Sequence, residues 1–321
     1  MGPFKHRSED LEMKKGMFFS ILGIILVLFL LSGLFITVNY QLSDNFDNEE
    51  KQIKIMNNIV ENINTDLEKA TYIILFRSLL TQLNYVTENG TYIDDLGSNF
   101  KELAFNGTLN GVEDKYMVNN TFNRWESNFK EGIKDSNLNI DLEFISFKVE
   151  QFSPWAISGI INANLNVTHD KGYASWYKNI NVTGSMSIIG FEDPVSIVES
   201  YGRIVQPIIP TNTTSWDIAN FKYAMENQEY IASERAPNYL QRLEGDFNED
   251  ENGIEYIVNP DELDDADLYT LIYNRSAIDH IYWSTGTVDV YRVDTISNGG
   301  YPTFRLDNET AEAYNIDNDI Y

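Results

Sequence analysis

Oxygen-bearing side chains alternate along an acidic stretch, residues 246–255, in the pattern of a calcium-binding loop. Ca²⁺ takes about six to eight oxygen ligands, so a loop with a carboxylate or amide at every second position, followed by glycine, can turn them inward. With Asn248 at the first position of such a loop, the twelfth position, which normally carries a bidentate Glu, is Asn259. The sequence is therefore compatible with a Ca²⁺ site and also with an acidic loop that is simply exposed to solvent. The candidate ligands are Asp246, Asn248, Asp250, Asn252 and Glu255.

The other reactive residue types form no recognisable catalytic motif. The chain has no cysteine, which excludes disulfides, thiolate metal sites and a thiol nucleophile. It has no phosphate-binding loop, dinucleotide fingerprint, nucleophile elbow or HExxH pair. His280 follows Asp279 in a predicted strand, where neighbouring side chains point to opposite faces and cannot form a dyad. We expect no enzyme, no catalytic residue and no cofactor besides Ca²⁺. The enzymatic alternative is an exported hydrolase that uses a carboxylate pair such as Asp193 and Glu199.

An uncharged apolar run, residues 17–39, is the element expected to position the rest of the chain. As a helix it would be roughly 34 Å long, enough to cross a hydrocarbon core about 30 Å thick. Lys14 and Lys15 precede it and Asp44 and Asp47 follow it, so the N-terminus is expected in the cytoplasm and the large remainder outside the cell. We expect single-pass anchoring in the cell membrane, with the lipid bilayer as a partner. A cleaved secretory signal is disfavoured, because its apolar region spans only about 7–15 residues.

The charge of the chain argues against one class of partner. A formal net charge of −26 repels nucleic acid, so no nucleic-acid partner is expected. An acidic surface also keeps an exported protein soluble. Eight Asn-X-Ser/Thr sequons lie beyond the apolar run, as an exported glycoprotein would have them. The glycosylation candidates are Asn89, Asn106, Asn119, Asn166, Asn181, Asn212, Asn274 and Asn308.

Helical periodicity continues beyond the apolar run. Residues 41–85 contain no Pro or Gly, and apolar side chains recur in steps of three and four residues. This stripe would pack either on the chain's own domain or on a second copy as a coiled coil. Residues 95–105 and 121–134 predict two further short helices. The stripe consists of Ile53, Met56, Val60, Ile63, Leu67, Ala70 and Ile74.

A period of two then predicts an antiparallel sheet. Apolar side chains occupy odd positions in residues 157–167 and even positions in residues 180–188, so each strand buries one face. Residues 138–152 supply a third strand, and its apolar phase changes between Phe144 and Ile145, which indicates a bulge. The remaining expected elements are two helices, a hairpin and a loose acidic tail, over residues 215–233, 236–243, 278–293 and 307–321.

The expected fold class is α+β. A long N-terminal transmembrane-plus-stalk helix packs on an antiparallel β-sheet, with a helical insertion and a C-terminal α/β extension. The expected segments are a cytoplasmic leader, a transmembrane helix, a stalk helix, the helical insertion, the sheet and the C-terminal extension, over residues 1–16, 17–40, 41–85, 86–137, 138–200 and 201–321.

The junction of Lys14-Lys15-Gly16 with the apolar run resembles the processing site of archaeal class III signal peptides and type IV prepilins. The resemblance implies that a membrane peptidase cuts between Gly16 and Met17, and it implies a pilin-like architecture. Major pilins usually carry Glu at the fifth mature position, where this chain has Ile21. Minor, tip-located pseudopilins can lack this Glu. Segments similar to those of archaeal pilin-like surface proteins are Asp193-Pro194, Arg242-Leu243-Glu244-Gly245 and Gly253-Ile254-Glu255.

The residues and the resemblance together predict a non-enzymatic, membrane-anchored cell-surface protein. It would be a pilin-like minor component of a type IV pilus-like filament, or an adhesin. Other pilin-like subunits are then expected partners, through the N-terminal helix. The alternative is a single-pass extracytoplasmic binding or receptor-like protein that does not enter a filament.

Overall fold

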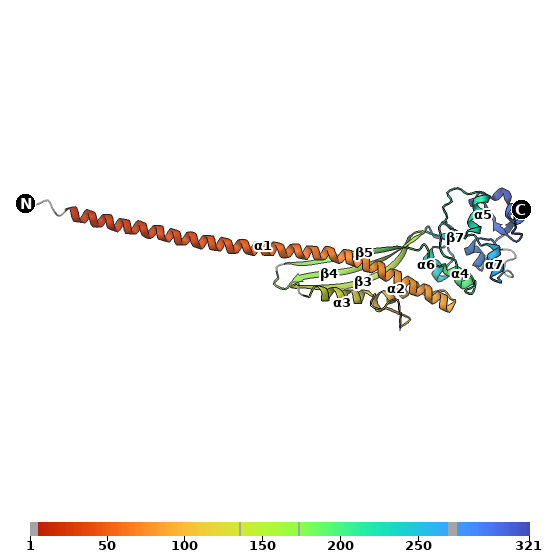
Figure 1. Ribbon diagram of the computed structural model, residues 1–321, viewed down its shortest axis with the longest axis horizontal. Helices are drawn as coiled ribbons and strands as arrows, with labels where there is room; N and C mark the ends of the chain where they lie inside the picture. Colours follow the sequence, from red (N-terminus) through yellow and green to blue (C-terminus); the bar gives the residue numbers. More distant parts are fainter. Residues whose placement is uncertain (1–5, 135, 173, 269–274) are drawn as a thin grey trace, which may run out of the picture.

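One long helix organises the chain. The structure, a computed structural model, describes residues 6–134, 136–172, 174–268 and 275–321, with side chains of the first helix mainly from Glu50 onward. Helix α1 (His6–Asn89) is continuous over 84 residues. The other elements gather around its C-terminal part and beyond it, and its N-terminal part extends away from them (Figure 1). We call residues 50–321 the body.

The apolar stripe of α1 packs on the chain's own sheet. Met56, Val60, Ile63 and Leu67 are buried, whereas Ile53 is 42% exposed and marks where the contact begins. The helix lies mainly on strands β4 and β5 of the sheet. Of the two packings that the sequence left open, the structure therefore shows the intramolecular one.

The main sheet has three antiparallel strands in the order β3 (Leu138–Ser153), β4 (Ala156–His169) and β5 (Ser175–Ser187). The predicted hairpin is confirmed: Ile161 pairs with Val182, and both are buried. The predicted bulge is also confirmed, because the β3–β4 register shifts between Phe144 and Ser146.

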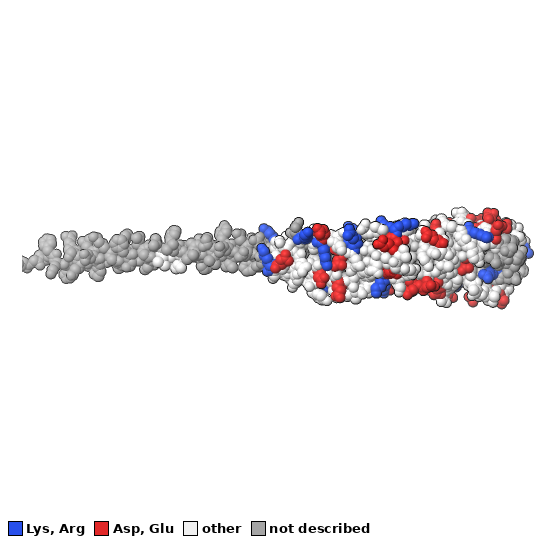
Figure 2. All heavy atoms as spheres, turned by 90° about the horizontal axis from the view of Figure 1, so that it is seen from below, with Lys and Arg blue, Asp and Glu red and all other residues white. Residues whose placement is uncertain are grey.

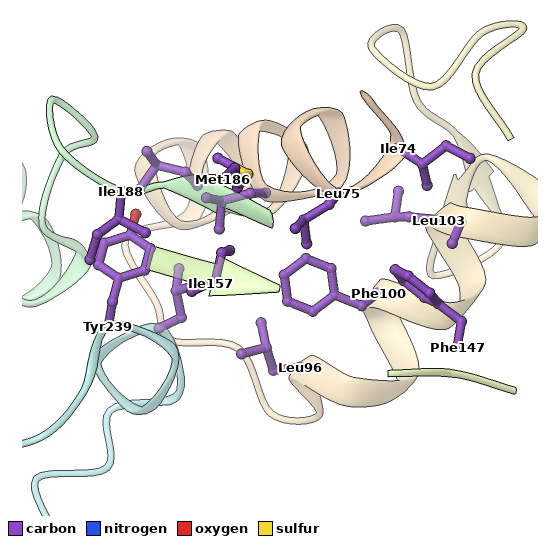
Figure 3. Packing of buried hydrophobic residues seen from close by; sticks show 14 of the residues in the cluster. Ile74, Leu75, Leu96, Phe100, Leu103, Phe147, Ile157, Met186, Ile188 and Tyr239 are labelled. Atoms are coloured by element: carbon purple, nitrogen blue, oxygen red, sulfur yellow. The ribbon is translucent and has the colours of Figure 1, made fainter. Parts of the chain in front are cut away.

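Two short helices complete the cover of the buried face. Helix α2 (Leu96–Asn106) begins at Asp95, whose side chain accepts a hydrogen bond from Ser98 N. Helix α3 (Phe122–Gly132) begins at Thr121 in the same way. Both predicted helices are confirmed. A small hairpin, β1 (Thr108–Leu109) and β2 (Val112–Glu113), lies between them. Figure 3 shows Leu75 of α1 and Phe100 of α2 converging with Ile157 of β4 in the core.

The rest of the body caps one end of the sheet, at the end of the molecule opposite the N-terminus (Figure 1). Two small antiparallel ladders, β6–β7 and β8–β9, lie among its short helices. A second hydrophobic cluster, including Phe221, Ile278 and Phe304, fills it. The elements are α4 (Pro194–Glu199), α5 (Ile218–Glu226), β6 (Tyr230–Ala232), α6 (Tyr239–Glu244), β7 (Ile254–Tyr256), α7 (Pro260–Asp265), α8 (Asp279–Trp283), β8 (Val290–Arg292), α9 (Asp294–Asn298), β9 (Arg305–Asp307), α10 (Asn308–Ala313) and η2 (Asp317–Asp319).

Several predictions for this region are wrong. The expected hairpin over residues 278–293 is helix α8 followed by strand β8, which pairs with β9 instead. The tail from Asp307 is not loose, because Asp307 caps α10 and Tyr314 is buried. The helix expected over residues 215–233 is shorter, since Asp217 caps it and the chain turns to form β6.

The predicted fold class, with a transmembrane-plus-stalk helix, is also wrong. Over the part of the chain that the structure describes, no helix is long and apolar enough to cross a membrane. The physical reason lies in α1 from Glu50 onward, where charged side chains such as Glu50 and Lys54 recur on the exposed face and make the helix amphipathic. Most side chains of the predicted span, residues 17–40, lie outside the description, with Val27 and Leu31 as described exceptions. The structure shows an α+β fold with small antiparallel sheets.

A glycine of β5 allows α1 to touch the sheet backbone to backbone, and its partner in the ladder is also a glycine. Gly159 of β4 and Gly184 of β5 are paired in the ladder and buried. A Cβ atom on Gly184 would lie 2.5 Å from Tyr72 N and 2.9 Å from the carbonyl carbon of Thr71. Only a residue without a side chain fits at this distance.

Replacing Gly184 with alanine should therefore separate two rigid elements. We expect Gly184→Ala to lower the free energy of unfolding by about 1–3 kcal/mol, the usual range for overpacking a close-packed interior. Gly132→Ala is the control, because a Cβ atom there meets nothing within 4 Å. Chemical denaturation of the full-length protein measures both. Equal midpoints for the two variants would show that α1 does not need this close approach.

Candidate functional site

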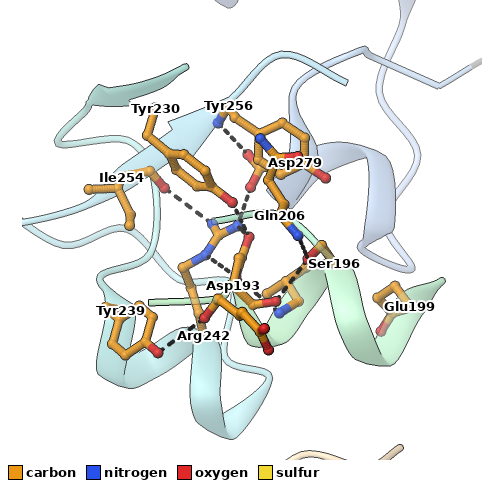
Figure 4. A network of polar contacts seen from close by, with 12 residues as sticks. Asp193, Ser196, Glu199, Gln206, Tyr230, Tyr239, Arg242, Ile254, Tyr256 and Asp279 are labelled. Atoms are coloured by element: carbon orange, nitrogen blue, oxygen red, sulfur yellow. Dashed lines mark hydrogen bonds and ion pairs between the residues drawn. The ribbon is translucent and has the colours of Figure 1, made fainter. Parts of the chain in front are cut away.

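Three charged side chains of the body, Arg242, Asp193 and Asp279, form a buried network of ion pairs (Figure 4). Arg242 Nε donates to Asp193 Oδ1 at 3.0 Å, and its Nη2 donates to both carboxylates. Its Nη1 donates to the carbonyl oxygen of Ile254 at 3.2 Å. All three charged side chains are fully buried. The residues come from α6, the N-terminus of α4 and α8, so three separate segments meet here.

The carboxylates of the network have further partners. Asp193 accepts a hydrogen bond from Tyr230 Oη at 2.8 Å and caps α4 through Val195 N at 3.0 Å. Asp279 Oδ1 accepts from Tyr256 N at 3.2 Å. Burial raises the pKa of Asp279 above its ordinary value, although Arg242 opposes this shift. A sealed and hydrogen-bonded network of this kind joins segments of the chain and has no access to a substrate.

A second buried cluster adjoins the first. A hydrogen bond of 3.0 Å joins Glu255 Oε2 and His280 Nε2, and Tyr314 Oη donates to the other oxygen of Glu255. Burial raises the pKa of Glu255, but the hydrogen bonds with His280 and Tyr314 outweigh burial and hold the pKa below 4.5. The cluster ties α10 and α8 to strand β7.

The predicted calcium ligands do not come together. Glu255 is in the interior, as just described, and not in the acidic loop. Asp246 Oδ1 accepts from Asn248 N at 3.0 Å, and Asp250 Oδ1 accepts from Asn252 N at 2.8 Å, so both carboxylates close local turns. Among the described residues, no group of three or more His, Asp or Glu side chains could hold a metal ion. Calcium binding by this loop stays a prediction.

The carboxylate pair of the hydrolase alternative is not assembled. Asp193 is committed to Arg242, and Glu199 accepts a hydrogen bond from Tyr92 Oη at 2.9 Å. Asp279 and His280 are neighbours on helix α8 and not on a strand, but their side chains bind different partners, as expected.

The remaining predicted site residues lie on the surface or outside the description. Gly16 and Met17 fall in the part of α1 whose side chains are not described, and Asn274 also lies outside the described residues. The other sequon asparagines are all exposed, which satisfies the steric requirement for a glycan. Their glycosylation stays a prediction. These exposed positions are Asn89, Asn106, Asn119, Asn166, Asn181, Asn212 and Asn308.

An apolar groove on the surface was not predicted from the sequence. A space of about 560 Å³, which we call the α1 groove, is lined by Phe76 and Leu80 of α1 and by Tyr116 and Phe191. Phe76 and Phe191 meet edge to face, with ring centroids 5.8 Å apart. Tyr72 stacks on Phe76 from the preceding turn. The signal in the sequence is this second stripe of apolar residues four apart, beside the stripe that enters the core.

Comparisons supply no further guide to the site. No protein-family model, curated protein or solved structure matches the chain.

Removing the single cation of the charge network should strongly destabilise the body. We expect Arg242→Met to lower the free energy of unfolding by about 3–5 kcal/mol, because it leaves Asp193 and Asp279 buried without a counter-ion. Arg124→Met, on the exposed surface of α3, is the matched control. Adding Asp193→Asn and Asp279→Asn to Arg242→Met should restore part of the loss. Thermal and chemical unfolding measure the effect. Equal unfolding free energies for Arg242→Met and Arg124→Met would show that the buried network does not depend on Arg242 as its counter-ion.

Glu255 should make the body sensitive to acid. Its folded pKa lies below 4.5, so as the pH falls below this value the unfolded chain takes up a proton that the folded protein excludes, and stability is lost. Glu255→Gln should therefore lose less unfolding free energy than the parent between about pH 5 and about pH 3. Asp279, whose pKa is raised by burial, changes the pH dependence of stability in the opposite direction, but it is present in both the parent and Glu255→Gln. Glu309→Gln, at an exposed position, should leave the pH profile unchanged. Parallel profiles for Glu255→Gln and the parent would refute the assignment.

Proposed function

We propose that this protein is a non-enzymatic cell-surface protein, a pilin-like minor component of a type IV pilus-like filament or an adhesin. One observation carries the proposal. Helix α1 is continuous over 84 residues, and its C-terminal part is built into the core while the preceding part extends away from the body (Figure 1). This geometry suits a protein that presents a folded body at the end of a helix.

The C-terminal part of α1 packs into the core of the body over several helical turns. Met56, Ile63, Leu67 and Ile74 are almost completely buried on one face of the helix. Figure 3 shows further helix residues among the side chains of the sheet and of α2. Because the contact extends over several helical turns, the body follows any change in the orientation of α1. A subunit of an assembly needs this property.

The chemistry of the body supports a role without catalysis. Arg242, Asp193 and Asp279 are buried and bonded to one another. Glu255 is likewise bonded within the interior. On the face shown in Figure 2, basic and acidic side chains are interspersed over the body and form no single basic patch.

The location proposed for the chain is the cell membrane, with the N-terminus in the cytoplasm and the body outside. The charge asymmetry around residues 17–39 supports this orientation. The exposed sequon asparagines are compatible with it. The alternative, a binding protein that does not enter a filament, is favoured by the α1 groove, because exposed apolar grooves commonly receive partner segments.

The N-terminus of the native protein distinguishes these functions. We expect sequencing of the protein from its own cells to begin at Met17, and the protein to appear in the sheared filament fraction. Gly16→Val should leave the leader attached and remove the protein from that fraction. Gly23→Val is the control, and it should be cleaved and recovered in the filament fraction like the parent. An intact leader on a protein found only with the cell envelope would reject the filament proposal and favour the binding protein.

A further inference from the structure

A second surface pocket, of about 280 Å³, lies between α1 and α3. We call it the Trp125 pocket. Its apolar surface comes from Trp125 and from Ala70, Ile73 and Ile74 of α1, of which Ile73 is 43% exposed. Its polar rim consists of Asp66, Lys69, Asn119, Asn120, Thr121 and Asn128. The pocket therefore combines one indole with a ring of amide, hydroxyl and charged groups.

The indole is held in place without a ligand. Trp125 Nε1 donates to Asp66 Oδ2 at 2.9 Å. Its ring stacks on Phe129, one turn later in α3, with centroids 5.5 Å apart and an interplanar angle of 23°. Trp125 also lines a small inner cavity with Ile63 and Leu165, so the residue joins the surface to the core. A wall fixed in this way loses little conformational entropy when a ligand binds.

The rim has unused hydrogen-bonding capacity. Within the described parts of the chain, the side chains of Lys69, Asn119 and Asn128 make no hydrogen bond or ion pair, and Asp66 uses only one carboxylate oxygen. Each amide can donate and accept. The charge of Lys69 is offset by that of Asp66, so the rim is close to neutral. Such a rim suits an uncharged ligand with many hydroxyl groups.

We propose that the Trp125 pocket binds a neutral saccharide. One sugar ring places its apolar C–H face on Trp125, and its hydroxyls bond to Lys69, Asn128 and Asp66. The volume is near the lower end of the range for ligand pockets, about 300–1,000 Å³, and fits one or two rings. A phosphate-bearing ligand would need more positive charge than one offset lysine supplies. A purely apolar ligand would bury the rim groups without partners.

Two sources can supply this saccharide. One is a free or surface glycan that enters from solution. The other is a glycan attached to Asn119, which is exposed, belongs to the sequon Asn119-Asn120-Thr121 and lines the pocket. The chemistry of recognition is the same in both cases. The proposal goes beyond the filament or adhesin role and does not depend on it.

The test uses full-length protein from a host that adds no N-glycans. Lactose, cellobiose and chitobiose are the probes, and binding is followed by saturation-transfer NMR and titration calorimetry. We expect saturable binding of at least one disaccharide. Lys69→Ala and Asn128→Ala should each weaken it roughly fivefold by removing a hydrogen bond. Lys51→Ala, at an exposed position of the same helix, should bind like the parent.

A change at Trp125 needs a folding control, because this side chain also contacts the core. Trp125→Phe should lower the affinity by reducing the stacking surface and releasing Asp66, and its melting temperature reports whether the body stays folded. The lysine and asparagine variants keep the test valid if Trp125→Phe unfolds. Failure of all three disaccharides to bind, or equal binding by the parent and both rim variants, would overturn the proposal.

Native glycosylated protein separates the two sources. If it binds the disaccharide only after enzymatic deglycosylation, and if Asn119→Asp from the same cells binds without that treatment, the attached glycan occupies the pocket. If it binds the disaccharide directly, the saccharide comes from solution. Asp is a suitable replacement because Asn119 has a positive φ of 60°, which Asp also tolerates.

Discussion

The close approach of α1 to the sheet is the constraint on which the rest of the structure depends. The backbone at Thr71 and Tyr72 lies against Gly184, and Gly159 is its partner in the ladder. Thr71 is buried, and its hydroxyl donates a hydrogen bond to Leu67 O at 2.7 Å, so this hydroxyl is paired at the contact. Because a Cβ atom at Gly184 would collide with the backbone of α1, this point fixes how closely α1 can lie on the sheet. The stripe from Met56 onward then packs on either side, and one helix becomes both the core of the body and its extension.

A different interaction holds the C-terminal part of the body. This region consists of short helices and two-stranded ladders, which have little stability alone. Arg242 gathers three of its segments through Asp193, Asp279 and the carbonyl of Ile254. Buried ion clusters cost desolvation energy, so their main effect is to reject arrangements in which a charge stays unpaired. Gln151 of β3 accepts a hydrogen bond from Tyr239 N at 2.8 Å and so connects this region to the sheet.

These two constraints divide the chemistry of the molecule. The buried charged side chains Arg242, Asp193 and Asp279 help to specify the fold. The candidate binding sites are pockets on the surface beside α1. The α1 groove is apolar, whereas the Trp125 pocket has a polar rim on a different part of the same helix. Both are lined by exposed residues of α1 beside the buried stripe, such as Phe76 and Ile73, and the Trp125 pocket also reaches Ala70 and Ile74 of the stripe. The helix thus carries three functions along its length: it extends from the body, it forms the core, and it lines the candidate binding sites.

Local pattern determined much of the body. The stripe of α1, the helices capped by Asp95 and Thr121, the hairpin of β4 and β5 and the bulge after Phe144 follow from periodicity and capping, which are properties of neighbouring residues. The sequon positions, and the resemblance of the junction at Gly16 to a prepilin processing site, also come from the sequence alone. The local sequence pattern could not distinguish the short helix that begins at Asp279 from a strand, because a segment of five residues shows no clear periodicity. It also placed Glu255 in an acidic loop, although burial beside His280 and Tyr314 removed it from that loop. Only the tertiary structure brought Asp193, Arg242 and Asp279 together, and only it placed Trp125 beside Lys69. These residues are far apart in the chain, and packing of the intervening elements, which no local pattern encodes, decides their contact.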